Sequence, residues 1–156
     1  MDKNKLIDII IRTLTGIGKY SPEALNLILG TIAQESAFGK YRRQLGGGIA
    51  LGICQIEPDT FNDIVDNYLF YKPDLKCKIM KTCKVSSFNA KDLVENDRLS
   101  VAMCRCQYAR FPEPLPGRYD VEGMAMLYKL RYNTPLGKAT EEEFIENYKR
   151  YVEISS

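Results

Sequence analysis

The chain of 156 residues contains no histidine. The Ser-His and Cys-His pairs, in which an imidazole activates the nucleophile, are therefore excluded as catalytic devices. A long hydrophobic run is also missing, because Asp8 interrupts the apolar residues 6–11. That stretch is too short for a membrane span or for the core of a signal peptide. We therefore expect neither a membrane span nor a signal peptide.

The cysteines are few and odd in number, five in all, so they cannot all be paired in disulfides. This favours a chain that folds in a reducing cytoplasm. The paired spacing typical of zinc ligands is missing from Cys77, Cys83, Cys104 and Cys106. A net charge of +2, with the basic residues spread along the chain, gives no indication of a nucleic-acid partner. We expect no metal and no cofactor.

The length and the composition fit one globular domain that spans residues 1–156. Hydrophobic residues make up 45% and charged residues 27%, which is ordinary for a folded protein. Apolar residues recur at helical spacing, and the start signals include Ser21 before Pro22, Asp120, and Thr140 with Glu143. The predicted fold is mainly α, with helices over residues 2–15, 21–35, 58–68, 99–111, 120–132 and 140–148.

Two segments break the helical pattern. Residues 39–52 hold five glycines, which predict tight turns or a small hairpin that forms one lip of a cleft. Residues 72–87 begin with Lys72 and carry further lysines at 76, 78, 81 and 84 around two cysteines. We interpret this second segment as a solvated loop insertion, with contact to a polymeric ligand as the alternative.

Glu35 is the most informative side chain. Leu25, Ile28 and Ile32 precede it at helical spacing, so its carboxyl falls on the buried face of the helix. Apolar surroundings and the negative end of the helix dipole both disfavour the charged form and raise the pKa of a carboxyl. An acid that stays protonated near neutral pH is what cleavage of a glycosidic bond needs. A surface glutamate at a frayed helix end is the other interpretation.

Two sequence blocks around this acid resemble a known family. Residues 35–40 read ESAFGK, and residues 52–60 read GICQIEPDT. In this order and spacing they are similar to the lysozyme-like superfamily, in its branch of lytic transglycosylases and goose-type lysozymes. Residues 131–137, RYNTPLG, resemble a degraded form of that family's third block, Ala-Tyr-Asn-Ala-Gly.

The resemblance implies a mainly α (α+β) lysozyme-like domain whose glycine-rich turn lines a saccharide cleft. The implied substrate is the glycan strand of bacterial peptidoglycan, cleaved at the β-1,4 bond between MurNAc and GlcNAc. Glu35 matches the catalytic acid of the family. The implied saccharide contacts are Ser36, Gln55, Tyr132 and Asn133, and in the family the matching tyrosine hydroxyl approaches the acid.

The residue that separates two chemistries is Glu57. It stands where goose-type enzymes have an aspartate that helps to activate water, whereas the following Pro58 and Thr60 are typical of transglycosylases, which use one carboxyl as acid and then base. The resemblance favours a transglycosylase, with a goose-type muramidase as the alternative. A third possibility is a bacteriophage wall-binding protein that has lost turnover.

A wall-degrading domain without a signal peptide is typical of a bacteriophage product. We expect such a protein to be made in the host cytoplasm and to act in the periplasm or the cell wall. A holin-type pore or the virion itself would deliver it, so virion components or a holin are the protein partners that the resemblance suggests.

Overall fold

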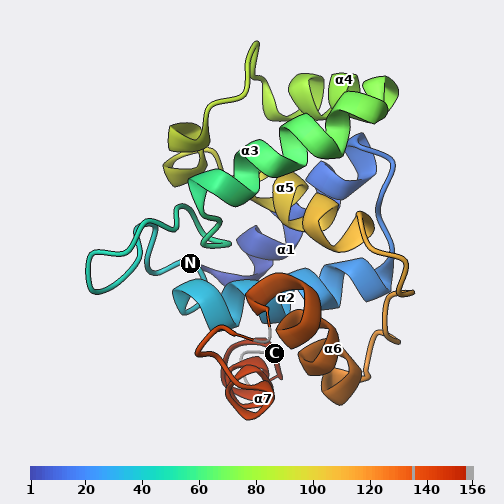
Figure 1. Ribbon diagram of the computed structural model, residues 1–156. Helices are drawn as coiled ribbons and strands as arrows, with labels where there is room; N and C mark the ends of the chain where they lie inside the picture. The colour runs from blue at the N-terminus through green and yellow to red at the C-terminus, as the bar shows by residue number, and fades with distance from the viewer. Residues whose placement is uncertain (135, 154–156) are drawn as a thin grey trace.

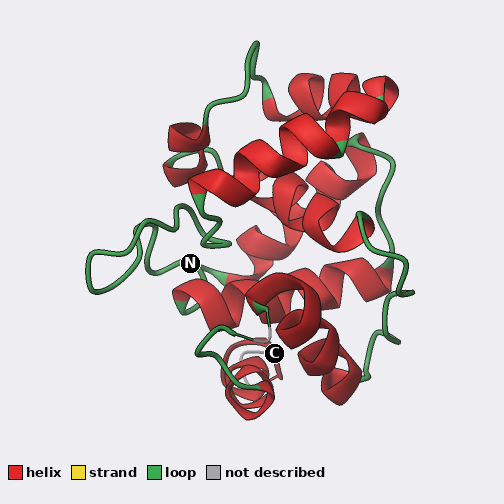
Figure 2. Cartoon of the chain, in the orientation of Figure 1, coloured by secondary structure: helices red, strands yellow, loops and turns green. Residues whose placement is uncertain are grey.

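Helices make up the regular structure of residues 1–134 and 136–153, the part of the chain that this computed structural model describes (Figures 1 and 2). The longer helices are α1 (Lys3–Gly16), α2 (Pro22–Ser36), α3 (Pro58–Asn67), α4 (Pro73–Cys83), α5 (Asp97–Ala109), α6 (Val121–Leu127) and α7 (Glu141–Tyr148). Shorter segments are the 3-10 helices η1 (Leu69–Tyr71) and η2 (Ala90–Val94) and the π-helical η3 (Tyr128–Asn133) and η4 (Lys149–Glu153). The mainly α prediction is confirmed.

Several helix starts follow from side-chain caps that the sequence predicts. The side-chain oxygens of Ser21, Asp120 and Thr140 each accept a hydrogen bond from the backbone N–H three residues later, at 2.9–3.1 Å. Pro22 follows Ser21 at the first helical position, where a missing N–H does no harm. These bonds satisfy N–H groups that have no partner within the helix, and so they fix where α2, α6 and α7 begin.

Helix α5 lies at the centre of the packing. It contacts α1, α2, α3 and α4, and Figure 1 shows it enclosed by them, with α6 and α7 on the far side of α2. Eight of its 13 residues are buried, and all of these except Ser100 are hydrophobic. A helix with this pattern is stable only inside a protein. The buried hydrophobic side chains of all the helices join into one core cluster around it.

The prediction of a loop over residues 72–87 is wrong, because this segment contains helix α4. Leu75, Ile79 and Cys83 recur every fourth residue and are buried, and α4 packs against α1 and α5. The lysines occupy the remaining positions around the helix. A narrow apolar stripe among five lysines is therefore enough to stabilise a helix when two neighbouring helices pack against that stripe.

The glycine-rich segment between α2 and α3 forms turns. Its ladder pairing is limited to two isolated bridges, Arg43 with Leu51 and Leu51 with Ile56, and the described residues form no strand. It is thus a looser version of the predicted hairpin. None of the helices in the described residues combines the length and the apolarity of a bilayer-spanning segment.

Gly52 shows why glycine is needed in this loop. Its φ of +79° is the left-handed region, and a Cβ there would lie 2.4 Å from the backbone oxygen of Leu93 and from Oγ of Ser100. Gly46 has nearly the same φ, +81°, but a Cβ there would meet nothing within 4 Å. The two glycines therefore separate the effect of backbone strain from that of steric overlap.

We predict that Gly52→Ala lowers the free energy of unfolding by roughly 3–5 kcal/mol, because strain and overlap add. Gly46→Ala, with strain alone, should lower it by about 1–2 kcal/mol. Urea denaturation of both variants measures the difference. Equal losses would show that the contact of Gly52 with Leu93 does not constrain the loop.

Candidate active site

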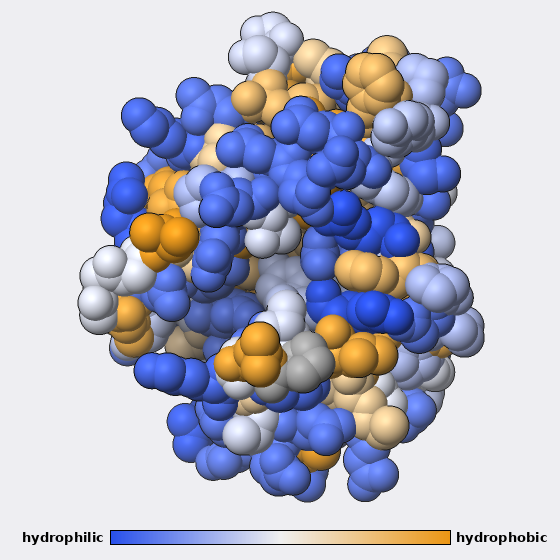
Figure 3. Space-filling view, in the orientation of Figure 1, coloured by the Kyte–Doolittle hydropathy of each residue, from blue (hydrophilic) through white to orange (hydrophobic). Residues whose placement is uncertain are grey.

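A cavity of about 340 Å³ lies where the end of α2, the glycine-rich loop, the start of α3 and η3 meet. Figure 3 shows the molecule hollowed here, with a mainly hydrophilic rim. Five residues singled out from the sequence line it together: Glu35, Gln55, Glu57, Tyr132 and Asn133. The rest of the lining is Gln44, Ala50, Ile56, Thr60, Gln107 and Thr134. Residues from four separate regions of the chain thus converge on one hollow.

The carboxyl of Glu35 sits in the last turn of α2, at the wall of this cavity. Burial raises its pKa from 4.5 to about 7, and a hydrogen bond from the Tyr128 hydroxyl acts in the opposite direction. That bond joins Tyr128 Oη to Glu35 Oε1 at 2.7 Å. With a pKa near neutrality, Glu35 has both its protonated and its charged form accessible, so it can donate and accept a proton there.

Tyr128, not Tyr132, holds the acid. The hydroxyl of Tyr132 instead donates to the backbone oxygen of Cys54 at 2.6 Å, so the predicted approach of Tyr132 to Glu35 is wrong. The ring of Tyr132 stacks between the rings of Tyr108 and Tyr128, with centroids 5.3 Å and 5.8 Å away. Tyr132 thus stabilises the glycine-rich loop through the bond to Cys54 and the position of Tyr128 through ring stacking.

Helix geometry explains why Tyr128 takes the place at Glu35 that the sequence assigned to Tyr132. The two tyrosines stand one turn apart on the same side of the helix. The sequence therefore places both near the site but does not show which of them contacts Glu35. The structure winds residues 128–133 as a π-helix, a rare form that often occurs at functional sites. Of the degraded third block, Pro135 lies outside the described residues.

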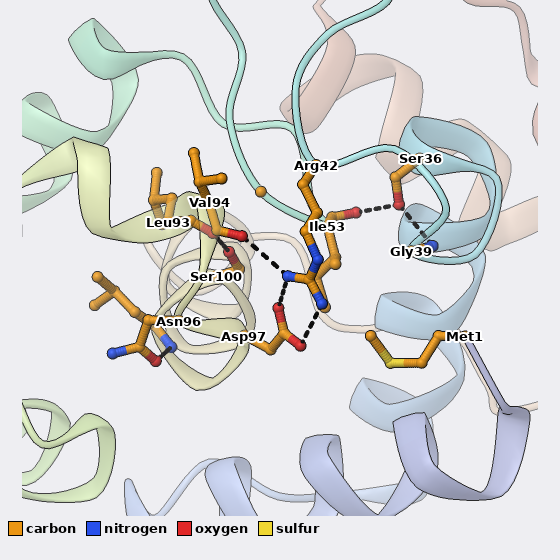
Figure 4. A network of polar contacts seen from close by, with 12 residues as sticks. Met1, Ser36, Gly39, Arg42, Ile53, Leu93, Val94, Asn96, Asp97 and Ser100 are labelled. Carbon is orange, nitrogen blue, oxygen red and sulfur yellow. Dashed lines mark hydrogen bonds and ion pairs between the residues drawn. The ribbon is translucent and has the colours of Figure 1, made fainter.

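Ser36 lies beneath the cavity and does not line it. Its buried hydroxyl is 2.6 Å from the backbone oxygen of Ile53 and 3.1 Å from that of Ile32, and it accepts a bond from the N–H of Gly39 (Figure 4). The predicted saccharide contact is thus not available in this structure. Ser36 ties the end of α2 to the loop that carries Gln55.

An ion pair anchors the other side of the loop, and sequence analysis missed it. The guanidinium of Arg42 forms two hydrogen bonds to Asp97 at the start of α5 and a third, of 3.0 Å, to the backbone oxygen of Val94 (Figure 4). The backbone oxygen of Arg42 also accepts from the N–H of Gly52 at 2.7 Å. No short motif announces this pair, because 55 residues separate its members.

The backbone reverses sharply on both sides of the cavity. Ala37, Phe38 and Gly39 follow the acid with φ of 50°, 64° and 84°, and Gln55 has φ of 49°. Such left-handed residues other than glycine are strained, and they persist only where the surroundings hold them. The Gln55 side chain is held in turn, because its Nε2 donates to the backbone oxygen of Gly52 at 2.9 Å.

Uncharged amides dominate the remaining wall, and two of them were not predicted. Gln107 of α5 donates to the backbone oxygen of Arg131 at 2.9 Å, and Gln44 accepts from the N–H of Ala50 at 3.1 Å. Apart from Glu35 and Glu57 the lining carries no charge. Amide and hydroxyl groups are suited to hydrogen-bonding neutral hydroxyl and acetamido groups. The described residues contain no cluster of three or more metal-ligating side chains.

Comparison of the chain with protein-family models, with curated protein sequences and with solved structures finds no match. The family resemblance of residues 35–40 and 52–60 therefore stays a prediction from the sequence. The function has to be argued from the chemistry of the cavity.

We predict that Glu35→Gln stabilises the protein increasingly as pH rises. The pKa of Glu35 is raised in the folded state, so the folded chain binds more protons than the unfolded chain between pH 4.5 and about 7. Stability of the native chain is lost across this window, whereas glutamine does not titrate. The stability difference should grow by up to about 3 kcal/mol from pH 4 to pH 8.

Urea denaturation at the two pH values measures this difference. At pH 4 both side chains are neutral, so that measurement reports the exchange of carboxyl for amide alone. A stability difference that does not change with pH would contradict the burial of the Glu35 carboxyl.

Proposed function

We propose that the protein cleaves the β-1,4 bond between MurNAc and GlcNAc in peptidoglycan, as a lytic transglycosylase with Glu35 as acid and base. The observation that carries this proposal is a carboxyl with a pKa of about 7 at the wall of a cavity otherwise lined by uncharged polar groups. The sequence blocks at residues 35–40 and 52–60 point to the same chemistry.

The proposed reaction uses Glu35 twice. The protonated carboxyl first gives its proton to the glycosidic oxygen, so that the bond to MurNAc breaks and the GlcNAc end leaves as an alcohol. The C6 hydroxyl of the same MurNAc then attacks its anomeric carbon and returns its proton to the Glu35 carboxylate. The product carries a 1,6-anhydro ring, and no water enters.

Tyr128 and the amides position the groups in this scheme. The Tyr128 hydroxyl donates to Oε1 of Glu35 and so stabilises the carboxylate formed after the first proton transfer. Its bond also leaves Oε2 as the oxygen free to face the substrate. Gln55 and Asn133 lie on the same wall, where they can hydrogen-bond sugar hydroxyl or acetamido groups.

One observation favours hydrolysis as a second candidate. Glu57 is exposed and lines the same cavity as Glu35, so a second carboxylate is present where water could be activated. An inverting hydrolase needs two carboxyl groups about 6.5–9.5 Å apart, with room for water between them. In that case the protein would be a goose-type muramidase.

The biological setting follows from the same proposal. A bacteriophage protein made in the host cytoplasm would reach the periplasm or the wall through a holin-type pore, or would enter with the virion. A wall-binding virion protein without turnover is the non-enzymatic alternative. Loss of turbidity of a cell-wall suspension separates an enzyme from such a binder.

We predict that Glu35→Gln reduces wall cleavage by at least about 100-fold, because glutamine keeps the shape but cannot donate the proton. Mass spectrometry of the fragments released by the native protein should show 1,6-anhydro ends, about 18 Da lighter than hydrolysed ends. Glu57→Gln should change the rate only mildly and leave these ends unchanged. Reducing ends together with a severely impaired Glu57→Gln variant would establish the muramidase instead.

We also predict that activity falls as pH rises through about 7, because cleavage needs the protonated form of Glu35. Tyr128→Phe removes a bond that lowers the pKa of Glu35, so this alkaline limb should move to higher pH. Tyr108→Phe is the matched control, since that hydroxyl pairs with Thr31 inside the core. The rate on a soluble peptidoglycan oligosaccharide measures both limbs, and a limb shifted equally in both variants would remove the role of Tyr128.

A further inference from the structure

Residues 72–84, which comprise α4 and its two flanking residues, concentrate positive charge. They contain five lysines and one aspartate, a net charge of +4. The whole chain carries only +2, so the other residues together carry −2. The molecule is thus electrically polarised, with one basic region against a slightly acidic remainder. A charge distribution of this kind steers anionic partners to one face.

Two lysines of this region and Lys19, from the turn after α1, line another cavity, of about 450 Å³, which shares no described lining residue with the Glu35 cavity. Lys19, Lys72 and Lys78 line it, and Asp74 is the one acidic residue in its wall. Lys78 Nζ lies close to the turn at Gly18, 3.6 Å from where a Cβ on that glycine would be. Within the described residues none of these three ammonium groups takes part in an ion pair. The cavity therefore presents unneutralised positive charge.

Two aromatic side chains stand exposed beside these lysines. Phe70 is 69% exposed and Tyr71 is 73% exposed, although both belong to η1, directly before α4. Their rings pack edge to face on each other, with centroids 5.1 Å apart, and Tyr71 also lines the lysine cavity. Two adjacent exposed rings form a small apolar patch within the basic surface, and a partner with an apolar part would gain free energy by burying them.

We propose that this basic aromatic surface, formed by Phe70, Tyr71, Lys19, Lys72 and Lys78, binds the head-group region of an anionic phospholipid bilayer. The ammonium groups would face the lipid phosphates, while the two rings enter the boundary between head groups and acyl chains. Aromatic rings favour that boundary, and each lysine near an anionic leaflet adds to the affinity. This proposal does not depend on the reaction at Glu35.

Other polyanions fit the surface less well. A phosphodiester wall polymer would use the lysines but would leave the exposed ring of Phe70 without a partner. Single-stranded nucleic acid needs successive ring faces on which bases can stack along a basic groove. Here the two rings stand nearly perpendicular, at an interplanar angle of 81°, so they do not form a row of parallel faces. A bilayer is the partner that uses both the charge and the apolar rings.

The chain has no tryptophan, which permits a clean spectroscopic test. We expect the fluorescence of Phe70→Trp to shift to shorter wavelength with vesicles of equal parts phosphatidylglycerol and phosphatidylcholine. Vesicles of phosphatidylcholine alone should cause no shift, and roughly 1 M salt should reverse it, because the Debye length then falls to about 3 Å. Tyr119→Trp, at an equally exposed tyrosine of another loop, is the control and should not respond.

Co-sedimentation with the same vesicles tests the lysines. Lys72→Gln with Lys78→Gln should lower the partition coefficient roughly tenfold or more. The matched control, Lys138→Gln with Lys149→Gln, removes the same charge from exposed sites elsewhere and should change it less than twofold. Equal losses in the two double variants would overturn the proposal, as would an equal fluorescence shift with soluble polyphosphate or a single-stranded oligonucleotide. Wall cleavage by the Lys72 and Lys78 variant should stay at the native rate.

Discussion

The hydrogen bond between Ser36 and Ile53 is the contact on which the candidate site depends. Ser36 directly follows Glu35, so the bond that ties the end of α2 to the loop also sets where Gln55 stands relative to the acid. Arg42 and Asp97 attach the other side of the same loop to α5. A glycine-rich segment with almost no ladder pairing is thereby held in one position. The loop wall of the cavity is thus fixed by its contacts with two helices, α2 and α5.

The position of the Glu35 carboxyl lowers the stability of the folded protein. A carboxyl with a pKa of about 7 is less stable in its charged form when the chain is folded, so its burial lowers stability at neutral pH. The surrounding core offsets this loss in part through packed aromatic rings, in which Tyr128 stacks on Tyr132 and packs at a tilt on Phe144. One of these rings, that of Tyr128, carries the hydroxyl that donates to Glu35. Packing and acid chemistry therefore share one set of side chains.

The sequence predicts the features that depend on local patterns. Capping residues such as Ser21 and Thr140 reveal helix starts, and helical phase places Glu35 against apolar neighbours. It fails where the outcome depends on partners far along the chain. The apolar stripe of α4 forms a helix only because α1 and α5 pack against it. The Arg42–Asp97 pair joins positions 55 residues apart. The choice of Tyr128 over Tyr132 depends on a local π-helix that spacing alone does not show.

Helix α3 connects the two surfaces for which functions are proposed. Its first turn contributes Thr60 to the Glu35 cavity, and its last residue, Asn67, is followed after two buried residues by the exposed pair Phe70 and Tyr71. Ten residues of α-helix span about 15 Å. A molecule bound to a bilayer through Phe70 and Tyr71 would therefore have the Glu35 cavity at the opposite end of α3 from the lipid contact. If the proposed cleavage at Glu35 takes place, binding there would restrict it to glycan strands close to the membrane.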